Sequence, residues 1–323
     1  TSLPAVDAAS APEPRRLGWL RRRFTSSPER MLLAARIALV TNVGIMLSGG
    51  LVRVSGSGLG CSNWPKCDTR VLPSEVHAPT FIEFGNRMLT FAVGAAAIFA
   101  IFCALTQVRY RKDFTVLSVV LLLGVVLQAV IGGLSVLYDL DWIWISAHYL
   151  VSILVLLVPA AMLTWRAGQD TKAPREPGAP DRLTRNSVLA LLPIGVLALA
   201  AGTLATASGP HGGGAGTGDV VQRFDIHGTG TLEWVVQRHG AIAAIFGLAI
   251  VLAWGVAKTR GASPQLQLTL TGAALLVALQ GVIGLIQYGL ELPHALVWVH
   301  VALSAITWVA VAWAWQNARL ANS

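Results

Sequence analysis

Three histidines in strongly apolar stretches have the clearest chemical potential in this sequence. They are His148 in "AHYLVS", His239 in "QRHGAIA" and His300 in "WVHVALS". Two imidazoles that face each other in a dry helix bundle can hold a heme iron from both sides. A single buried histidine is as often a hydrogen-bonded packing residue, but the recurrence of the pattern favours a heme ligand. Zinc or copper fits less well because no Cys or carboxylate stands beside His239 and His300.

Glu83 and Asn86 in "FIEFGNR" form a second candidate group. They stand three residues apart, so on a helix they share a face. Asn is a poor iron ligand, and a heme held by His148 alone would keep one coordination position open for dioxygen. A nearby carboxylate could then position a substrate or relay protons. The alternative for Glu83 is an exposed acid favoured by the positive end of a helix dipole.

The first outer loop carries three further candidates. Cys61 and Cys67 bracket "SNWPK", and either a disulfide or two reduced thiols fit this spacing. Arg53 in "LVRVSGSGLG" could pair with a heme propionate, although a lipid headgroup or a backbone group would serve as well. Of the remaining histidines, which we place in loops or at a helix edge, His211 could line a site entrance.

The elements that must position these residues are membrane helices. The chain of 323 residues is 54% hydrophobic and 12% charged, and its apolar residues form runs of about twenty, the length that crosses a bilayer. We therefore predict an all-α polytopic membrane protein and no cleavable signal peptide. The eight predicted spans are 31–52, 84–106, 114–137, 143–165, 187–207, 237–257, 266–288 and 294–315.

The net charge of +8 predicts orientation rather than a nucleic-acid partner. Seventeen of the twenty-four Lys and Arg fall on one side of an eight-span arrangement. The positive-inside rule then places both termini in the cytoplasm. The lipid bilayer is thus its first partner.

An internal repeat organises the chain. Gln128, Gly132 and His148 match residues 152 positions later, and Asn86 matches His239 at an offset of 153. Four spans per half predict two tandem four-helix bundles related by a pseudo-twofold axis along the membrane normal. We expect the following division: 1–30 a cytoplasmic disordered tail, 31–165 the first bundle, 166–186 a cytoplasmic linker, 187–316 the second bundle, and 317–323 a cytoplasmic tail.

From residue 31 to about 316 the chain resembles the heme A synthase family. The motifs that carry the resemblance are "GGLVRVSGSGLGCSNWPKC", "EFGNR", "AHYLVS", "SGPH", "QRHG" and "WVHVALS". The resemblance implies oxidation of the C8 methyl group of heme O, through an alcohol, to the formyl group of heme A for cytochrome oxidase assembly. It implies heme b between His239 and His300, and a substrate site with His148 and the essential Glu83. Many relatives carry a second histidine at the position of Asn86.

The resemblance also implies partners, namely a heme O synthase that supplies the substrate and a reductant such as quinol. A homo-oligomer is compatible with this organisation. Two other functions fit parts of the sequence. A di-heme b-type cytochrome that passes electrons from quinol explains the histidines and the repeat, but not the asymmetry at Glu83 and Asn86. A transporter built on the parallel repeat predicts broken helices and paired charges at mid-membrane.

Overall fold

The structure is a computed structural model that describes residues 23–67, 72–73, 77–172, 181–214, 216–218 and 220–319. The described residues are mostly helical and form no named strand, which confirms the predicted all-α class. The long helices run in chain order as α2 (Pro28–Val54), α3 (Ala78–Thr106), α4 (Lys112–Leu137), α5 (Trp142–Val151), α6 (Val158–Asp170), α7 (Arg182–Ser208), α8 (Thr231–Thr259), α9 (Pro264–Gly289) and α10 (His294–Arg319).

The predicted number of membrane spans is confirmed within the described residues. Eight helical segments are long and apolar enough to cross a bilayer, and α5 and α6 together make the fourth. Several begin earlier than the apolar runs do. The helix α3 starts at Ala78, so Glu83 lies in its second turn, whereas the predicted span began at residue 84. Polar residues near the membrane surface can be helical because helix formation satisfies their backbone groups there as well.

The fourth span contains a short π-helix. The segment η2 (Ser152–Leu157) joins α5 to α6, so the span widens by one turn just after His148. Segments of this kind are rare and occur mostly as single turns at functional sites. No comparable break interrupts α10, the helix that carries His300.

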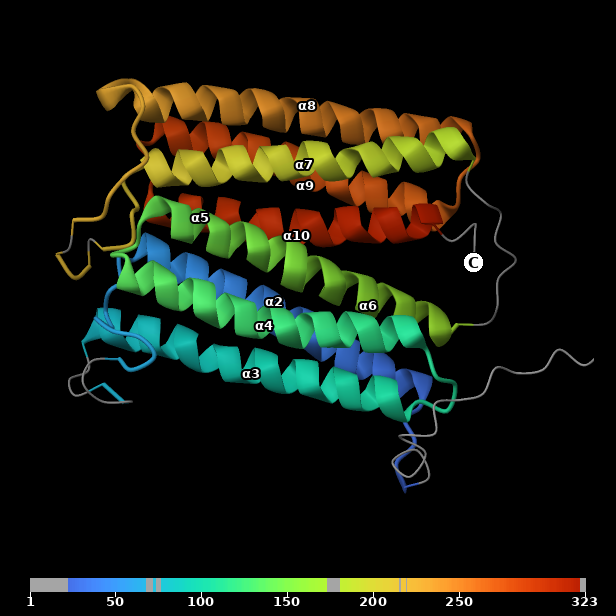
Figure 1. The fold of residues 1–323 in the computed structure, drawn as a ribbon. Coiled ribbons are helices and arrows are strands. Elements are labelled where there is room, and N and C mark those ends of the chain that lie inside the picture. Colours follow the sequence, from blue (N-terminus) through green and yellow to red (C-terminus); the bar gives the residue numbers. More distant parts are fainter. Residues whose placement is uncertain are drawn as a thin grey trace, which may run out of the picture.

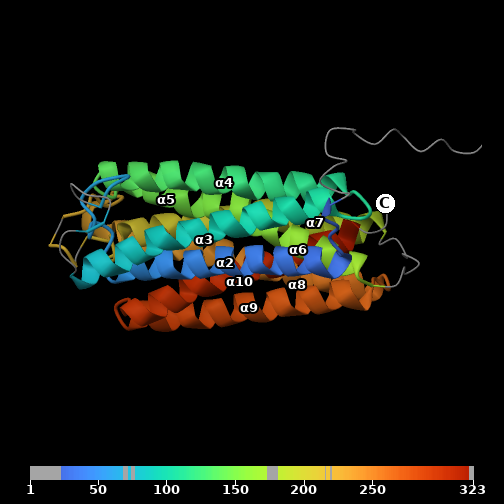
Figure 2. The same ribbon diagram turned by 90° about the horizontal axis from the view of Figure 1, so that it is seen from below.

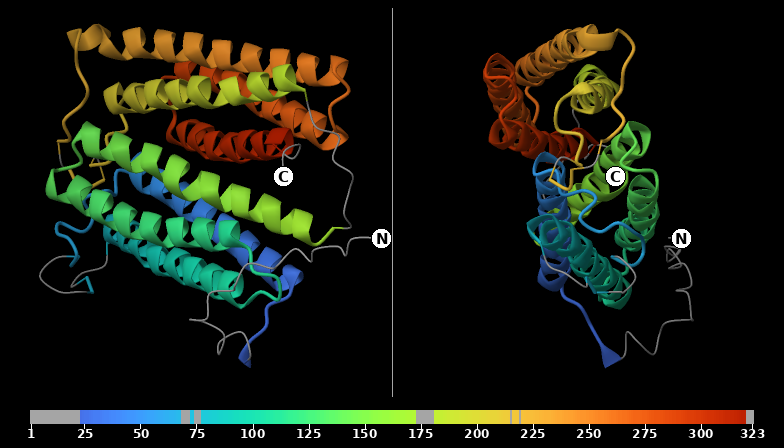
Figure 3. Two further views of the ribbon diagram at one scale, coloured as in Figure 1. Left: turned by 45° about the vertical axis from the view of Figure 1, so that its right-hand side comes forward. Right: turned by 90° about the vertical axis from the view of Figure 1, so that its left-hand side faces the viewer.

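The helices lie lengthwise beside one another (Figures 1 and 2). The segments α2 to α6 form one group and α7 to α10 the other, as the end view of Figure 3 also shows. Within the groups, α2 packs on α3 and α7 on α8, while α10 contacts both α2 and α6 across the boundary. The beginning of α2 and the end of α10 lie at the same end of the molecule (Figure 1). The pseudo-twofold relation of the groups stays a prediction.

The buried core has three parts. One cluster belongs to α2, α3, α4, η2 and α6, and another belongs to α7 through α10. A third cluster, with Ile153, Leu157 and Trp308 among its members, joins the two groups. Alanines are frequent in all three, so the backbones approach closely, which is how membrane helices gain packing contacts. Large apolar side chains such as Leu285 and Phe91 remain exposed, as expected of a surface that faces lipid.

Candidate functional site

The rings of His239 on α8 and His300 on α10 face each other, as the sequence predicts. Their centres lie 6.2 Å apart and their planes are 82° from parallel. A metal ion bonded at about 2 Å to one nitrogen of each ring would separate the ring centres by about 6 Å. The spacing therefore suits one iron ion between the two imidazoles.

The donors around this pair fit a heme rather than a small ion. Among the residues that the structure describes, no group of three or more His, Cys, Asp or Glu side chains lies close enough to hold a metal. A porphyrin brings four nitrogen ligands of its own and needs only axial ligands from the protein. The Nδ1 atoms of His239 and His300 are buried and form no hydrogen bond of ordinary geometry.

In the first group of helices, His148 and Asn86 occupy different surroundings. His148 projects from α5 toward Gly132 of α4, and its Nδ1 is buried without an ordinary hydrogen bond. Asn86 on α3 accepts a hydrogen bond of 2.5 Å from the Ser48 hydroxyl of α2 through its side-chain oxygen. The amide is thus tied to the neighbouring helix, and His148 is the imidazole available on this side.

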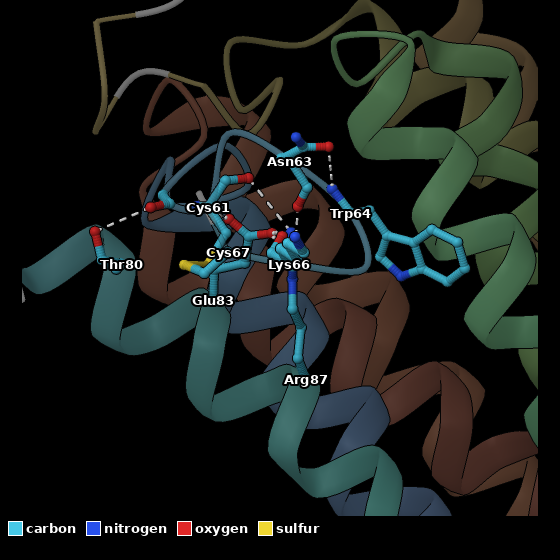
Figure 4. The surroundings of a disulfide bond; sticks show 9 residues. Cys61, Asn63, Trp64, Lys66, Cys67, Thr80, Glu83 and Arg87 are labelled. Carbon is cyan, nitrogen blue, oxygen red and sulfur yellow. Dashed lines mark hydrogen bonds and ion pairs between the residues drawn. A yellow bond between two sulfur atoms is a disulfide. The ribbon is translucent and has the colours of Figure 1, made fainter. Parts of the chain in front are cut away.

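Glu83 connects α3 to the loop that carries the cysteine pair. Cys61 and Cys67 form a disulfide, which confirms one of the two states predicted for them. The backbone N–H of Cys61 donates to Oε2 of Glu83 at 2.6 Å, and the carboxylate is almost fully buried (Figure 4). The loop also contacts α3 at Gly60, whose carbonyl accepts a 2.9 Å hydrogen bond from the Thr80 hydroxyl.

Arg87 is a member of this site that the sequence interpretation missed. Its guanidinium donates to Oε1 of Glu83, at 2.5 Å from Nη2 and 3.1 Å from Nε. It also donates to the backbone carbonyls of Asn63, Lys66 and Cys61 (Figure 4). The spacing of Glu83 and Arg87, four residues apart on one helix, is the signal that could have revealed the pair. Together they fix the loop over the N-terminal end of α3.

Arg53 reaches across to the second group of helices. Its Nε donates at 3.0 Å to the carbonyl of His211, and the His211 ring in turn bonds the carbonyl of Leu292 at 2.7 Å through Nε2. The rings of His211 and His294 lie 4.1 Å apart. Burial, together with nearby His294, Arg53 and Arg223, holds the pKa of His211 below its ordinary value. A contact between Arg53 and a heme propionate stays a prediction. It would use the same guanidinium that donates to the carbonyl of His211.

Two more contacts join the groups of helices near the candidate ligands. The Tyr149 hydroxyl, next to His148, hydrogen-bonds the Ser304 hydroxyl, one turn after His300. The indole N–H of Trp298 donates to the carbonyl of Leu47 on α2 at 2.8 Å. Nothing in the local spacing of these residues predicts such pairs, because they depend on how α2, α5 and α10 pack.

Comparison with known proteins gives consistent results. Heme A synthase of Alkalihalophilus pseudofirmus is 28% identical over 145 residues, 43% of this chain and 49% of that protein. Heme A synthase of Exiguobacterium sibiricum is 26% identical over 130 residues, 39% and 44% of the two chains. Protoheme IX farnesyltransferase of Thermus thermophilus is 28% identical over 281 residues, 84% of this chain and 45% of that protein. The chain thus spans about half the length of the curated relatives it matches.

A family model covers much more of the chain than the individual heme A synthases do. It is described as cytochrome oxidase assembly protein (COX15-CtaA), and it matches residues 33–312, from the first turns of α2 to the last turns of α10. This range includes all the candidate site residues described above. The chain therefore belongs to the COX15-CtaA family of cytochrome oxidase assembly proteins, in agreement with its resemblance to heme A synthases.

Proposed function

We propose that this protein is a heme A synthase, which oxidises the C8 methyl group of heme O through an alcohol to the formyl group of heme A. The observation that carries the proposal is the pair of facing imidazoles, His239 and His300, at a separation suited to one iron ion. Membership of the family and the names of the similar proteins support the choice of reaction.

His239 and His300 would hold a resident heme b. Both imidazoles come from long helices of the second group, so their separation is set by helix packing rather than by loops. Both histidines are partly buried between apolar helices, an environment that suits a buried cofactor. The bound heme supplies one-electron redox chemistry.

Heme O would bind in the first group of helices. His148 is the proposed iron ligand there, Asn86 lies at the position that matches His239, and Arg53 is the proposed partner of a propionate. Asn86 has no imidazole, and its side-chain oxygen accepts from the Ser48 hydroxyl. His148 would then be the one imidazole from these helices that holds the substrate iron, which would leave that iron able to bind dioxygen.

Glu83 is the proposed catalytic residue. Its carboxylate is buried and oriented by Arg87 and by the N–H of Cys61, so it can hold or move a proton at one defined place. The Cys61–Cys67 disulfide closes the loop that orients it.

The proposed setting is a bacterial plasma membrane with both termini in the cytoplasm. A heme O synthase would supply the substrate, and a quinol or another reductant would supply electrons. The similarity to a protoheme IX farnesyltransferase supports a role next to the step that supplies the substrate.

The test is heme extraction from membranes in which the full chain is expressed together with a source of heme O. We expect formyl heme only when the protein is present. A b-type spectrum without formyl heme would instead favour the di-heme cytochrome. In the same membranes, His300→Ala should remove the low-spin b-type spectrum because one axial ligand is lost. His227→Ala, in an outer loop, serves as the control.

A further inference from the structure

Glycines lie directly beneath the two facing imidazoles. On α7, a Cβ added to Gly202 would lie 3.0 Å from Cε1 of His239. On α9, a Cβ added to Gly284 would lie 3.5 Å from Cε1 of His300. Each ring therefore rests on bare backbone of the neighbouring helix, in space that any other side chain would partly fill.

The first group of helices shows the same arrangement. A Cβ on Gly132 of α4 would lie 3.1 Å from Cε1 of His148. A Cβ on Gly49 of α2 would lie 3.9 Å from the side-chain oxygen of Asn86. These glycines match Gly284 and Gly202 at the repeat offsets of 152 and 153 residues. All four ligand positions, including the one that has lost its histidine, thus face a glycine.

The backbone contacts of the rings explain why glycine is needed. His239 interacts with the backbone of Ala198, and His300 with the backbone of Gln280. Each of these residues stands four positions before the glycine under the ring. A helical side chain covers the turn on the N-terminal side of its own Cα, so a glycine uncovers the carbonyl four residues earlier. The Nδ1 atoms of both rings are buried and have no other hydrogen-bond partner.

We propose that Gly202, Gly284 and Gly132 are positioning residues for the iron ligands. Gly202 and Gly284 each bare a helix carbonyl toward which the Nδ1–H of the neighbouring imidazole would point, which would fix the tautomer that leaves Nε2 for iron. Gly132 leaves the matching space beside His148. The inference rests on the proposed function, because it takes the three histidines as ligands of heme iron.

Alanine substitutions test the proposal. In Gly202→Ala the added methyl group meets the movable end of a side chain, so the His239 ring shifts while the helices stay packed. We expect folded protein in wild-type yield, with a loss of about 10-fold or more in heme b affinity, the range found for groups that orient metal ligands. Gly284→Ala should have a smaller effect because 3.5 Å is an ordinary contact distance. The readouts are heme b per polypeptide and the low-spin optical spectrum of the purified full chain.

Two controls separate ligand positioning from packing. An added Cβ at Gly240 on α8 or at Gly281 on α9 meets no atom within 4 Å, so alanine at either position should change nothing. An added Cβ at Gly195, on the same helix as Gly202, would lie 3.0 Å from Phe246 and from Trp308. Gly195→Ala should therefore lower thermal stability while the folded fraction keeps its heme affinity.

Each outcome has one meaning. If the wild-type protein binds heme b with a low-spin spectrum and Gly202→Ala binds it equally tightly, the positioning role is wrong and the proposed function stands. If the wild-type protein itself shows no low-spin heme, the proposed function fails. Excess hemin added to Gly202→Ala should restore occupancy, because weakened binding responds to ligand concentration. Failure of this rescue, with loss of folded protein as in Gly195→Ala, would also overturn the proposal.

Discussion

At the scale of single residues, Glu83 combines a structural and a proposed chemical role. Its two oxygens have different partners: Oε2 accepts from the Cys61 amide and Oε1 from Arg87. Such a buried carboxylate is costly unless it is paired and hydrogen-bonded, and both conditions are met here. A substitution that tests catalysis by Glu83 must therefore preserve the hydrogen bond from the Cys61 amide of the loop.

Glu83→Gln best meets this requirement because its amide oxygen can still accept from the Cys61 amide, while Arg87 loses one acceptor but keeps its bonds to the loop carbonyls. We expect normal heme b content and a loss of about 100-fold or more in formyl heme, the usual contribution of a proton-transferring side chain. Heme extraction from membranes supplied with heme O measures both. Thr80→Ala, which breaks another contact of the same loop, should retain activity. Undiminished heme A production by Glu83→Gln would show that the carboxylate serves the loop alone.

Asn86→His restores the imidazole that the repeat predicts. Gly49 leaves room beneath this position, as Gly202 does beneath His239. With heme O supplied, we expect additional low-spin heme, up to about one per polypeptide, because the added imidazole supplies a second nitrogen ligand opposite His148. Optical and EPR spectra measure the spin state. Asn86→Gln, which adds length without an imidazole, should leave it unchanged. A spectrum of Asn86→His identical to that of the wild-type protein would exclude a heme at this position.

At the scale of elements, the π-helix η2 accounts for a shift in the repeat. His148 and His300 are 152 residues apart, but beyond η2 the buried positions match at 151: Ala160 with Val311, and Ala167 with Ala318. The fourth span thus contains one residue more than α10 over the same length. A π-turn absorbs such a residue without rotating the helix on either side.

Single deletions test this account. Leu154 in η2 and Ile306 in α10 are both exposed and are 152 residues apart. Deletion of Leu154 should convert η2 to a regular α-helical turn and keep folded yield and heme b content near wild type. Deletion of Ile306 should rotate His300 by about 100° relative to the buried face that follows it, with loss of heme b. Size-exclusion chromatography with heme detection compares the two. Equal damage from both deletions would contradict the inserted-residue account.

The sequence predicted the elements better than the contacts between them. Apolar runs of bilayer length predicted all eight spans, because length and hydropathy are local properties. The repeat predicted that His239 and His300 would meet. By contrast, η2 has no compositional signal, and the contacts of Arg87 depend on how the loop with Cys61 and Cys67 folds back over α3. Such features arise from tertiary packing, which the pattern of apolar residues along the sequence does not predict.

At the scale of the whole molecule, a junction of Arg53, His211 and His294 helps to hold the two groups of helices together. Arg53 of α2 donates to the carbonyl of His211, while His294 of α10 hydrogen-bonds the carbonyl of Val54. The junction brings two imidazoles within 4.1 Å of each other and close to a guanidinium. Protonation of His211 would add charge to a cluster that already contains Arg53 and Arg223.

Stability should therefore fall in mild acid. Burial, His294, Arg53 and Arg223 lower the pKa of His211 in the folded protein, so the unfolded chain binds that proton more tightly. The contribution of neutral His211 is complete above the unfolded value of about 6.5 and declines as the pH falls below it. We expect the melting temperature of the full chain in detergent to drop between pH 7.5 and pH 5.5. The drop should be smaller in His211→Gln, which does not titrate, whereas His227→Gln should behave as wild type because His227 lies outside the junction. An equal drop in wild type and His211→Gln would assign the acid sensitivity to other groups.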